Sequence, residues 1–196
     1  MFELVTPHAR FHRSFLAAAD EFLAADDASR ANLVQWPADE TFPGVDYNRV
    51  VLESPEAFAE YADFIAAQRL EDAPRPSTYV PCTELWMADG EEHLGRISLR
   101  HTLTDLLLTW GGHIGYSVRP SARRRGYATQ ALAGMLPVCA GLGIDPALVT
   151  CDTDNVASRR TIEKNGGVYE DTREGKLRFW VPTTASVRNQ ARLITE

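Results

Sequence analysis

The segment HIGYSVRPSARRRGYATQALAGML, residues 113–136, is the most informative part of the sequence. It begins with a strand-like run that Pro120 closes. A basic turn containing glycine follows and leads directly into a helical pattern, in which apolar residues recur at helical spacing from Leu132 to Cys139. Pro137 is expected to kink this helix or to end its regular part early. The stretch therefore predicts a strand, a tight turn and a helix in direct succession.

The turn between this strand and this helix has chemistry suited to a diphosphate. The first N–H groups of a helix have no partner within it, and the helix dipole places partial positive charge there. Gly126 leaves room for close approach of a ligand, and Arg123, Arg124 and Arg125 add charge. The chain contains neither GxxxxGK(S/T) nor GxGxxG, which excludes the P-loop and the dinucleotide fingerprint. The turn predicts a pyrophosphate site.

Upstream of this stretch, the pattern predicts a short strand at residues 2–5 and a helix at 14–25 with Ser14 as its cap. Residues 26–53 are rich in turn formers and are expected to be mostly loop. Ser54 followed by proline predicts the start of a second helix. The remaining predicted elements are a strand hairpin at 83–88 and 94–102, an ambiguous run at 103–110, a strand at 147–151, a helix at 154–164 and a last strand at 177–181. This order predicts a mixed sheet with helices packed on it, an α/β or α+β fold.

Composition limits the class of protein. The chain has 196 residues and a formal net charge of -7, which is typical of one globular domain and argues against a dedicated nucleic-acid binder. No apolar run is long enough to cross a bilayer, and the N-terminus does not resemble a secretory signal. Three cysteines without a CxxC spacing suit a reducing compartment, so we expect a cytoplasmic protein. His8 and His12 have helical spacing but no evident third ligand, so we expect no metal.

Two motifs together resemble the GNAT superfamily of acyl-CoA-dependent N-acetyltransferases. Arg123-x-x-Gly126-x-Ala128 is similar to the R/Q-x-x-G-x-G/A signature of that family. TCDTDNVASRRTIEKNGG, at residues 150–167, resembles its second motif, in which a strand and an Asn-x-x-Ser/Ala sequence lead into a short helix. The whole chain looks most like a bacterial subgroup of predicted acetyltransferases. The motifs occur in the family's order, separated by one predicted helix and one predicted strand.

The resemblance implies a fold and a domain organisation. It implies a single N-acetyltransferase domain over residues 1–196, with a variable N-terminal part at 1–80 and an acyl-CoA-binding core at 83–181. The sheet would be mixed and mostly antiparallel, with helices on both faces. A V-shaped splay would separate the two central strands, at 113–118 and 147–151.

The resemblance also implies how acetyl-CoA would be bound. Backbone N–H groups of the turn would hold the pyrophosphate, and the strand before it would pair with the pantetheine arm. The Val118 N–H would donate to the thioester oxygen, where negative charge develops. Asn155 and Ser158 would face the pantetheine or the leaving sulfur, although capping a helix is the commonest use of such an asparagine. The candidate cofactor-binding residues are Tyr116, Ser117, Val118, Arg123, Arg124, Arg125, Gly126, Tyr127, Ala128, Thr129, Asn155 and Ser158.

The implied reaction needs a base, because an amine is mostly protonated at neutral pH and must lose a proton before it attacks. His113 is the first candidate, since many relatives carry a glutamate near this position and its unperturbed pKa suits the task. Glu84 and His101, on neighbouring predicted strands, are weaker candidates. An ordinary strand histidine is an equally good interpretation of His113.

The departing thiolate needs a proton donor. Many family members place a tyrosine on the helix after the asparagine, but Ile162 occupies that position here. Tyr116, Tyr169 or water could substitute, and the sequence does not choose among them. Cys151 lies in an apolar strand pattern and is interpreted as a core residue rather than a nucleophile.

The function implied is transfer of acetyl from acetyl-CoA to an amine-bearing acceptor by direct attack. Its partners would be acetyl-CoA and that acceptor, with no nucleic acid and no membrane, and a homodimer is compatible with the sequence. The alternative is a non-catalytic acyl-CoA-binding or regulatory module, which the missing tyrosine favours. The first 80 residues, where acceptor specificity would lie, carry the least resemblance, so the acceptor stays open.

Overall fold

The computed structural model describes residues 1–184, which divide into two compact units. The first unit combines Met1–Arg96 with Tyr116–Tyr127, and the second combines Ile97–Gly115 with the described residues from Ala128 onward. The division falls inside two strands, β5 and β6. The assignment of the chain to a single acetyltransferase domain stays a prediction.

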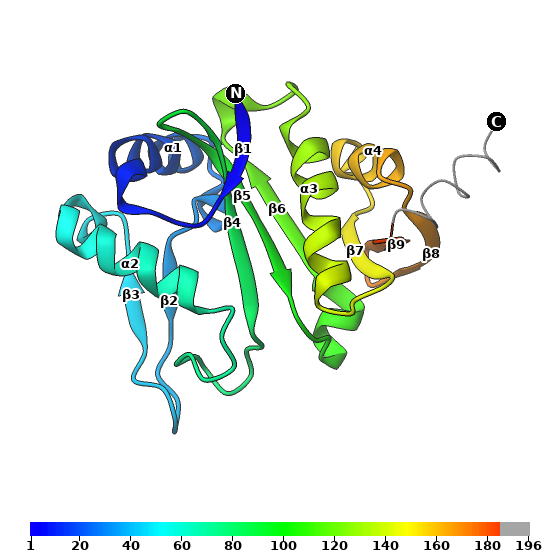
Figure 1. The fold of residues 1–196 in the computed structure, drawn as a ribbon, viewed down its shortest axis with the longest axis horizontal. Coiled ribbons are helices and arrows are strands. Elements are labelled where there is room, and N and C mark those ends of the chain that lie inside the picture. Colours follow the sequence, from blue (N-terminus) through cyan, green and yellow to red (C-terminus); the bar gives the residue numbers. More distant parts are fainter. Residues whose placement is uncertain (185–196) are drawn as a thin grey trace. The chain divides into compact units, whose positions relative to one another are not determined.

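The strands form a seven-stranded mixed sheet in the order β1-β4-β5-β6-β7-β9-β8 and a separate two-stranded sheet, β2-β3 (Figure 1). The strands are β1 (Phe2–Val5), β2 (Val34–Trp36), β3 (Val45–Tyr47), β4 (Cys82–Asp89), β5 (Glu92–Arg100), β6 (Ile114–Val118), β7 (Ala147–Asp152), β8 (Val168–Arg173) and β9 (Lys176–Val181). β1–β4, β7–β9 and β8–β9 pair antiparallel, whereas β6 and β7 pair parallel with Ile114 opposite Val149. The mixed, mostly antiparallel sheet with helices is confirmed, and the V-shaped splay stays a prediction.

The helices are α1 (His12–Ala24), α2 (Pro55–Ala67), α3 (Tyr127–Gly141) and α4 (Val156–Lys164), with short 3-10 turns η1 (Ala9–Phe11), η2 (Ala28–Arg30), η3 (Val51–Glu53) and η5 (Pro120–Ala122). A π-helical turn, η4, spans Leu107–Gly111, where the sequence pattern was ambiguous. α3 continues past Pro137 to Gly141, so the proline does not end it early. None of the helices within residues 1–184 has the length and apolarity that a bilayer crossing requires.

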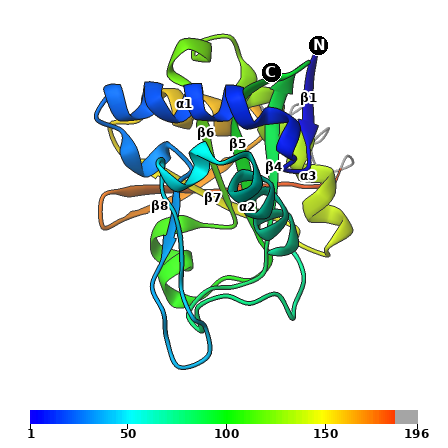
Figure 2. The same cartoon turned by 90° about the vertical axis from the view of Figure 1, so that its left-hand side faces the viewer.

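The first unit is organised around a buried aromatic cluster. Phe15 of α1 contacts Phe58 and Tyr61 of α2 and Trp86 of β4, at ring-centroid distances of 5.2, 5.4 and 5.3 Å. All four side chains are fully buried. Each contributes about 1.5–3 kcal/mol to stability through the apolar surface it removes from water. Figure 2 shows α1 crossing this unit beside α2, where this cluster holds both helices.

The two helix starts in this unit differ from each other. Ser54 caps α2 as predicted, because its hydroxyl accepts a hydrogen bond from the Ala57 N–H at 3.3 Å. Ser14 does not cap α1, which begins earlier, at His12. The Ser14 hydroxyl instead accepts from the His93 N–H of β5 at 2.9 Å. The predicted cap at Ser14 was therefore wrong, and the residue links α1 to the sheet.

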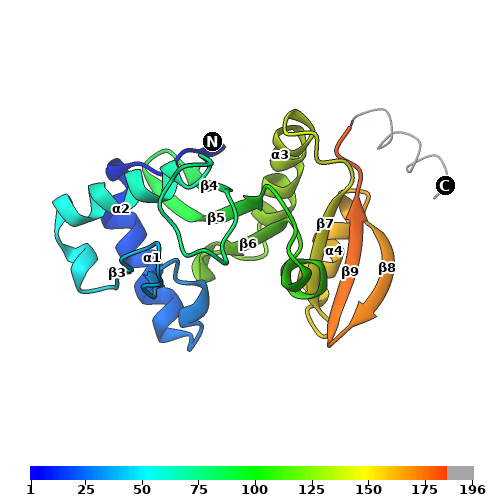
Figure 3. The same cartoon turned by 90° about the horizontal axis from the view of Figure 1, so that it is seen from below.

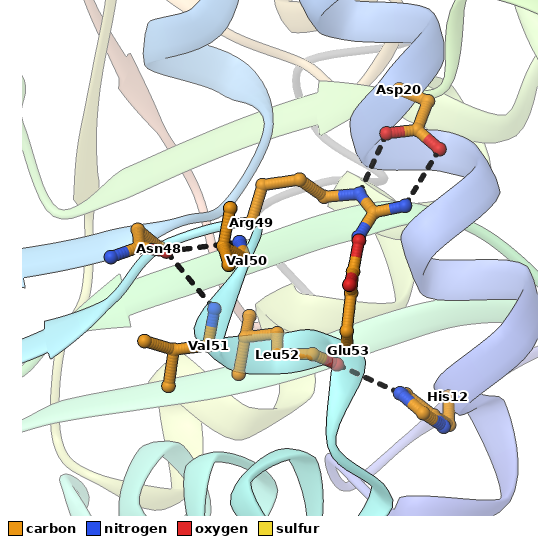
Figure 4. Close-up of polar contacts among 8 residues, drawn as sticks. All are labelled: His12, Asp20, Asn48, Arg49, Val50, Val51, Leu52 and Glu53. Carbon is orange, nitrogen blue, oxygen red and sulfur yellow. Dashed lines mark hydrogen bonds and ion pairs between the residues drawn. The ribbon is translucent and has the colours of Figure 1, made fainter.

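Residues 26–53 were expected to be mostly loop, but they contain the β2–β3 hairpin and two 3-10 turns. Polar side chains, together with apolar packing against α2, hold this segment (Figure 4). Arg49 donates to both oxygens of Asp20 on α1, at 2.6 and 3.0 Å, and to Glu53 at 3.1 Å. Asn48 accepts from two following backbone N–H groups, and the His12 ring lies 2.8 Å from the Leu52 carbonyl. These bonds link the segment to α1.

In the second unit, β9 lies between β7 and β8 (Figure 3). β8 was not predicted, because its sequence, VYEDTR, is almost wholly exposed and lacks an apolar alternation. Its pairing partner carries Arg178, which is 2% exposed and forms ion pairs with Glu170 at 2.8 Å and Asp171 at 3.1 Å. Two carboxylates on an edge strand therefore compensate one buried guanidinium. Gly166, at φ +84°, follows the end of α4 as predicted.

Candidate functional site

The turn between β6 and α3 has an unusual backbone. After η5, Arg124 adopts a φ of +64° and Gly126 a φ of +83°, and α3 begins at Tyr127. Alternation between right- and left-handed residues turns successive N–H groups toward one side, which makes a concave anion-binding surface. Arg124, Arg125 and Gly126 are exposed, so this surface adjoins solvent at the first turn of a helix. Only glycine adopts the Gly126 conformation without steric cost.

The three arginines of this turn divide into two kinds. Arg124 and Arg125 form no hydrogen bond or ion pair within residues 1–184 and are free to meet an anion. Arg123 is engaged: its Nε donates to the Val118 carbonyl at 3.2 Å and its guanidinium to Asp27 at 3.0 Å. The same guanidinium lies 5.6 Å from the centroid of the Phe22 ring. Arg123 therefore holds the turn, and two of the three predicted cations remain available for a ligand.

A carboxylate on α1 holds the other end of the turn. Glu21 accepts from Arg119 Nε at 2.8 Å, from the Ser121 N–H at 2.9 Å and from the Ser121 hydroxyl at 3.0 Å. Burial acts to raise the pKa of Glu21, but these donors outweigh it and keep its pKa below the ordinary value. Glu21 and Asp27 thus fix both ends of the turn to the segment of chain that begins with α1. Sequence reasoning missed both, because nothing local in the sequence links residues so far apart.

The end of β6 carries the residues predicted to meet a pantetheine arm. Ser117 is buried and its hydroxyl donates to the Arg30 carbonyl at 3.4 Å, whereas Tyr116 and Val118 are half-buried. β5 approaches this strand very closely at Gly95, where φ is +144° and a Cβ would lie 2.2 Å from the Ser117 carbonyl oxygen. Only glycine permits this approach. The strand is therefore placed by the absence of a side chain on its neighbour.

In the second unit, Asn155 caps α4: its side-chain oxygen accepts from the Ser158 N–H at 3.0 Å. The predicted capping role is confirmed, and the amide NH₂ is not used for it. The Ser158 hydroxyl is hydrogen-bonded to the Cys151 thiol. Burial raises the pKa of that thiol, which is 6% exposed, so Cys151 stays protonated and fits the predicted core role. Asn165 of the segment after α4 donates to the Thr129 carbonyl of α3 at 3.2 Å.

His113, the first candidate base, bridges two strands in the second unit. Its ring Nδ1 accepts from the Leu148 N–H at 2.9 Å, while its backbone N–H donates to the Leu148 carbonyl at 2.7 Å. Burial, with Arg100 nearby, lowers the pKa of His113 to about 4, so the ring is neutral at pH 7. With Nδ1 used as an acceptor, Nε2 must carry the proton. A ring in this tautomer has no free nitrogen to take a proton from an amine, so the geometry argues against His113 as the base.

Glu84, the weaker candidate on β4, is also engaged. Its carboxylate accepts from Asn32 Nδ2, Trp86 Nε1 and Arg96, each at 3.0 Å. Its side chain is 7% exposed. The geometry therefore gives Glu84 a fixed place in a buried network rather than the role of a free base.

The candidates for the proton donor lie in different places. Ile162 is fully buried on α4, so this position supplies no donor. Tyr169 is half-exposed on β8, where its hydroxyl lies 2.8 Å from that of Thr172. Tyr116 and His101 have partners of their own. Among the described residues, no cluster of three His, Cys, Asp or Glu side chains could hold a metal ion, and the three cysteines are free thiols.

Comparison with protein-family models gives one match. Residues 21–168 match the model described as Acetyltransferase (GNAT) domain. This range covers most of the chain and includes the turn at 119–126 together with both sequence motifs. No curated protein sequence matches the chain significantly.

Solved structures with the same fold are numerous. RimJ from Mycobacterium smegmatis, in complex with CoA-disulfide, has a TM-score of 0.58 at 15% identity, covering 98% of this chain and 92% of its own. The microcin C7 self-immunity acetyltransferase MccE, in complex with acetyl-CoA and AMP, has a TM-score of 0.57 at 12% identity over 92% of each chain. Ribosomal-protein-S5-alanine acetyltransferase from Vibrio fischeri has a TM-score of 0.56 at 11% identity, covering 94% and 93%. At these identities the likeness concerns the fold.

Proposed function

The chain belongs to the GNAT acetyltransferase family, and we propose that it transfers acetyl from acetyl-CoA to an amine by direct attack, without an acyl-enzyme. The observation that carries the proposal is the solvent-facing turn at 119–126, with its left-handed Arg124 and Gly126 and two unpaired arginines. A doubly charged diphosphate fits backbone donors, a helix N-terminus and guanidinium groups. The nucleotide end of acetyl-CoA supplies that group.

The proposed reaction follows from the chemistry of a thioester. The amine nitrogen forms a bond to the acetyl carbon, giving a tetrahedral adduct whose oxygen carries negative charge. The Val118 N–H is proposed to donate to that oxygen. The carbon–sulfur bond then breaks, the amide is released, and the proton lost by the amine ends on the CoA thiol. Because the His113 ring and the Glu84 carboxylate already form hydrogen bonds within the protein, we propose that the proton passes through water or Tyr116.

The acceptor is proposed at the level of an amine. The name of the Vibrio fischeri enzyme refers to a ribosomal protein, so a peptide with a free amino terminus belongs among the amines to be tested. The free cysteine thiols are consistent with our proposal of a cytoplasmic location. A homodimer also stays a proposal.

The CoA site is tested by Gly126→Glu, with Gly141→Glu as its matched control. Both replace a glycine of or beside α3 by glutamate, but Gly141 lies at the far end of the helix and a Cβ there meets nothing within 4 Å. Gly126→Glu combines a disfavoured backbone with a negative charge at the phosphate turn, so its CoA affinity should fall at least about 100-fold by calorimetry. The control should bind CoA as the wild type does. Normal CoA binding by Gly126→Glu would refute the site.

Catalysis is tested separately by thiol release from acetyl-CoA in the presence of an amine panel. The panel holds n-butylamine, spermidine, lysine amide and a heptapeptide with a free amino terminus. Amine-dependent thiol release by the wild type, with an acetylated product found by mass spectrometry, supports an enzyme. CoA binding without release supports the alternative, a non-catalytic acyl-CoA-binding or regulatory module, which the absence of a tyrosine at position 162 favours.

A further inference from the structure

We propose that Asn32 holds the amino group of the acceptor through its side-chain oxygen. This inference rests on the proposed acetyltransferase function and deepens it, because it names the group that meets the acceptor. Asn32 lies between η2 and β2 in the first unit, in a segment that showed no motif in the sequence.

The backbone of Asn32 is held in an uncommon conformation. Its φ is +60°, a left-handed value that costs free energy for any residue other than glycine, although asparagine tolerates it best. The buried Tyr61 hydroxyl donates to the Asn32 carbonyl at 2.7 Å and fixes it there. Non-glycine residues held in such conformations by their surroundings are concentrated at functional sites.

The side chain of Asn32 has only one possible orientation. Its Nδ2 donates to Glu84 Oε1 at 3.0 Å, and a carboxylate can only accept, so the amide nitrogen must face Glu84 and the oxygen must face away. The residue is 5% exposed, and within residues 1–184 no donor reaches Oδ1. A buried acceptor without a donor is costly. The oxygen is thus held ready for a donor that another molecule brings.

Glu84 is a positioning residue in this arrangement. Arg96 donates to its second oxygen at 3.0 Å, and Trp86 Nε1 donates to its first at 3.0 Å. The charge of the carboxylate is therefore matched by Arg96, and both oxygens are fixed. An uncharged amide oxygen beside a neutralised ion pair favours an amino nitrogen over a carboxylate or a phosphate, because those groups offer only acceptors.

The position of Asn32 also suits this role. The Arg30 carbonyl, two residues earlier, accepts from the Ser117 hydroxyl of β6 at 3.4 Å. The segment that carries Asn32 therefore lies against the strand that is proposed to receive the pantetheine arm, within the same unit. Val118, the proposed donor to the thioester oxygen, is the next residue of that strand.

The test is Asn32→Gly, because glycine accepts the φ of +60° and the variant loses only the amide. The matched control is Gln35→Ala, which removes an exposed amide three residues further along the same segment. For whichever amine of the panel the wild type acetylates best, kcat/KM of Asn32→Gly should fall by at least about tenfold, as expected for a lost buried hydrogen bond. Its CoA affinity by calorimetry should stay close to those of the wild type and of the control. Its melting temperature should fall by only a few degrees, because the variant also loses the hydrogen bond from Asn32 to Glu84.

The outcomes of this experiment distinguish a role of Asn32 in amine binding from a structural role and from failure of the proposed function. Loss of amine turnover with CoA binding unchanged, in a variant that is still folded at the assay temperature, supports the inference. A kcat/KM for the amine within about twofold of the wild type overturns it. A loss of CoA affinity as large as the loss of kcat/KM also overturns it, because it would show a general structural role. If the wild type acetylates no amine of the panel, the proposed function itself fails, and this result is distinct from the others.

Discussion

At the scale of single residues, a hydrogen bond can remove a side chain from the chemistry that its type suggests. His113 was the first candidate for the general base, yet its Nδ1 accepts a hydrogen bond from the Leu148 N–H. The lowered pKa of the ring, about 4, is a consequence of the burial that accompanies this bond. No pattern in the sequence indicates that a backbone donor meets this ring. The type of residue could be predicted, but its partner could not.

The structural role of His113 is tested with two variants. Asn places an oxygen near the position of Nδ1 and can accept from Leu148, so His113→Asn should retain most of the stability and the shape of the pH–rate profile. His113→Ala leaves a buried N–H unpaired and should lower the free energy of unfolding by about 1–3 kcal/mol. Urea unfolding and kcat/KM against pH check both statements. Loss of the acidic limb of the profile in His113→Asn would restore His113 as the base.

At the scale of elements, the sequence predicted the helices and strands that have apolar periodicity or a capping residue. It missed the elements that have neither. β6, the turn, α3, β7 and α4 all have a local signal, either apolar spacing or a capping residue, and all were predicted. β8 was missed because an exposed edge strand needs no apolar face. The β2–β3 hairpin was missed because its strands are only three residues long, and because the segment after it is held by a long-range ion pair between Arg49 and Asp20. The turn of the candidate site could be predicted, whereas the side chains that anchor it could not.

The close approach of β5 to β6 gives a prediction at this scale. A Cβ at Gly95 would overlap the Ser117 carbonyl, whereas one at Gly90, also at positive φ, meets nothing within 4 Å. Gly90→Ala therefore measures the backbone cost alone, about 1–2 kcal/mol. Gly95→Ala should cost about 1–3 kcal/mol more and should also weaken CoA binding, since it displaces Ser117. Urea unfolding measures the stability of both variants, and calorimetry measures their affinity for CoA. Equal effects of the two variants would contradict the close approach of β5 to β6.

At the scale of the whole molecule, the aromatic core of the first unit contains one polar side chain that lacks partners. His93 is 3% exposed between the rings of Phe15 and Trp86, both 5.1 Å away, and neither ring nitrogen has a hydrogen-bond partner within residues 1–184. Burial, followed by the charges of Arg119 and Arg96, lowers the pKa of His93 to about 3. The folded protein therefore needs this ring uncharged.

The consequence is a stability that depends on pH. Below pH 6.5 the unfolded chain binds a proton at this position and the folded protein does not, so the free energy of unfolding falls as the pH falls from 6.5 toward 3. The slope is about 1.4 kcal/mol per pH unit for one such group. His93→Leu should flatten this dependence in urea unfolding between pH 7 and 5, whereas His8→Leu, at an exposed ring, should not. Unchanged acid sensitivity in His93→Leu would contradict this origin.

The contacts of Glu21 and Asp27 with the turn at 119–126 have a consequence for engineering. A chimera that exchanges residues 12–27, which are α1 and the turn after it, for those of another enzyme would also remove the acids that hold Arg119 and Arg123. The CoA binding that we propose for this turn would then weaken for a reason unrelated to the amine. Transplanting the two acids with the new helix should keep the chimera loaded with its acetyl donor.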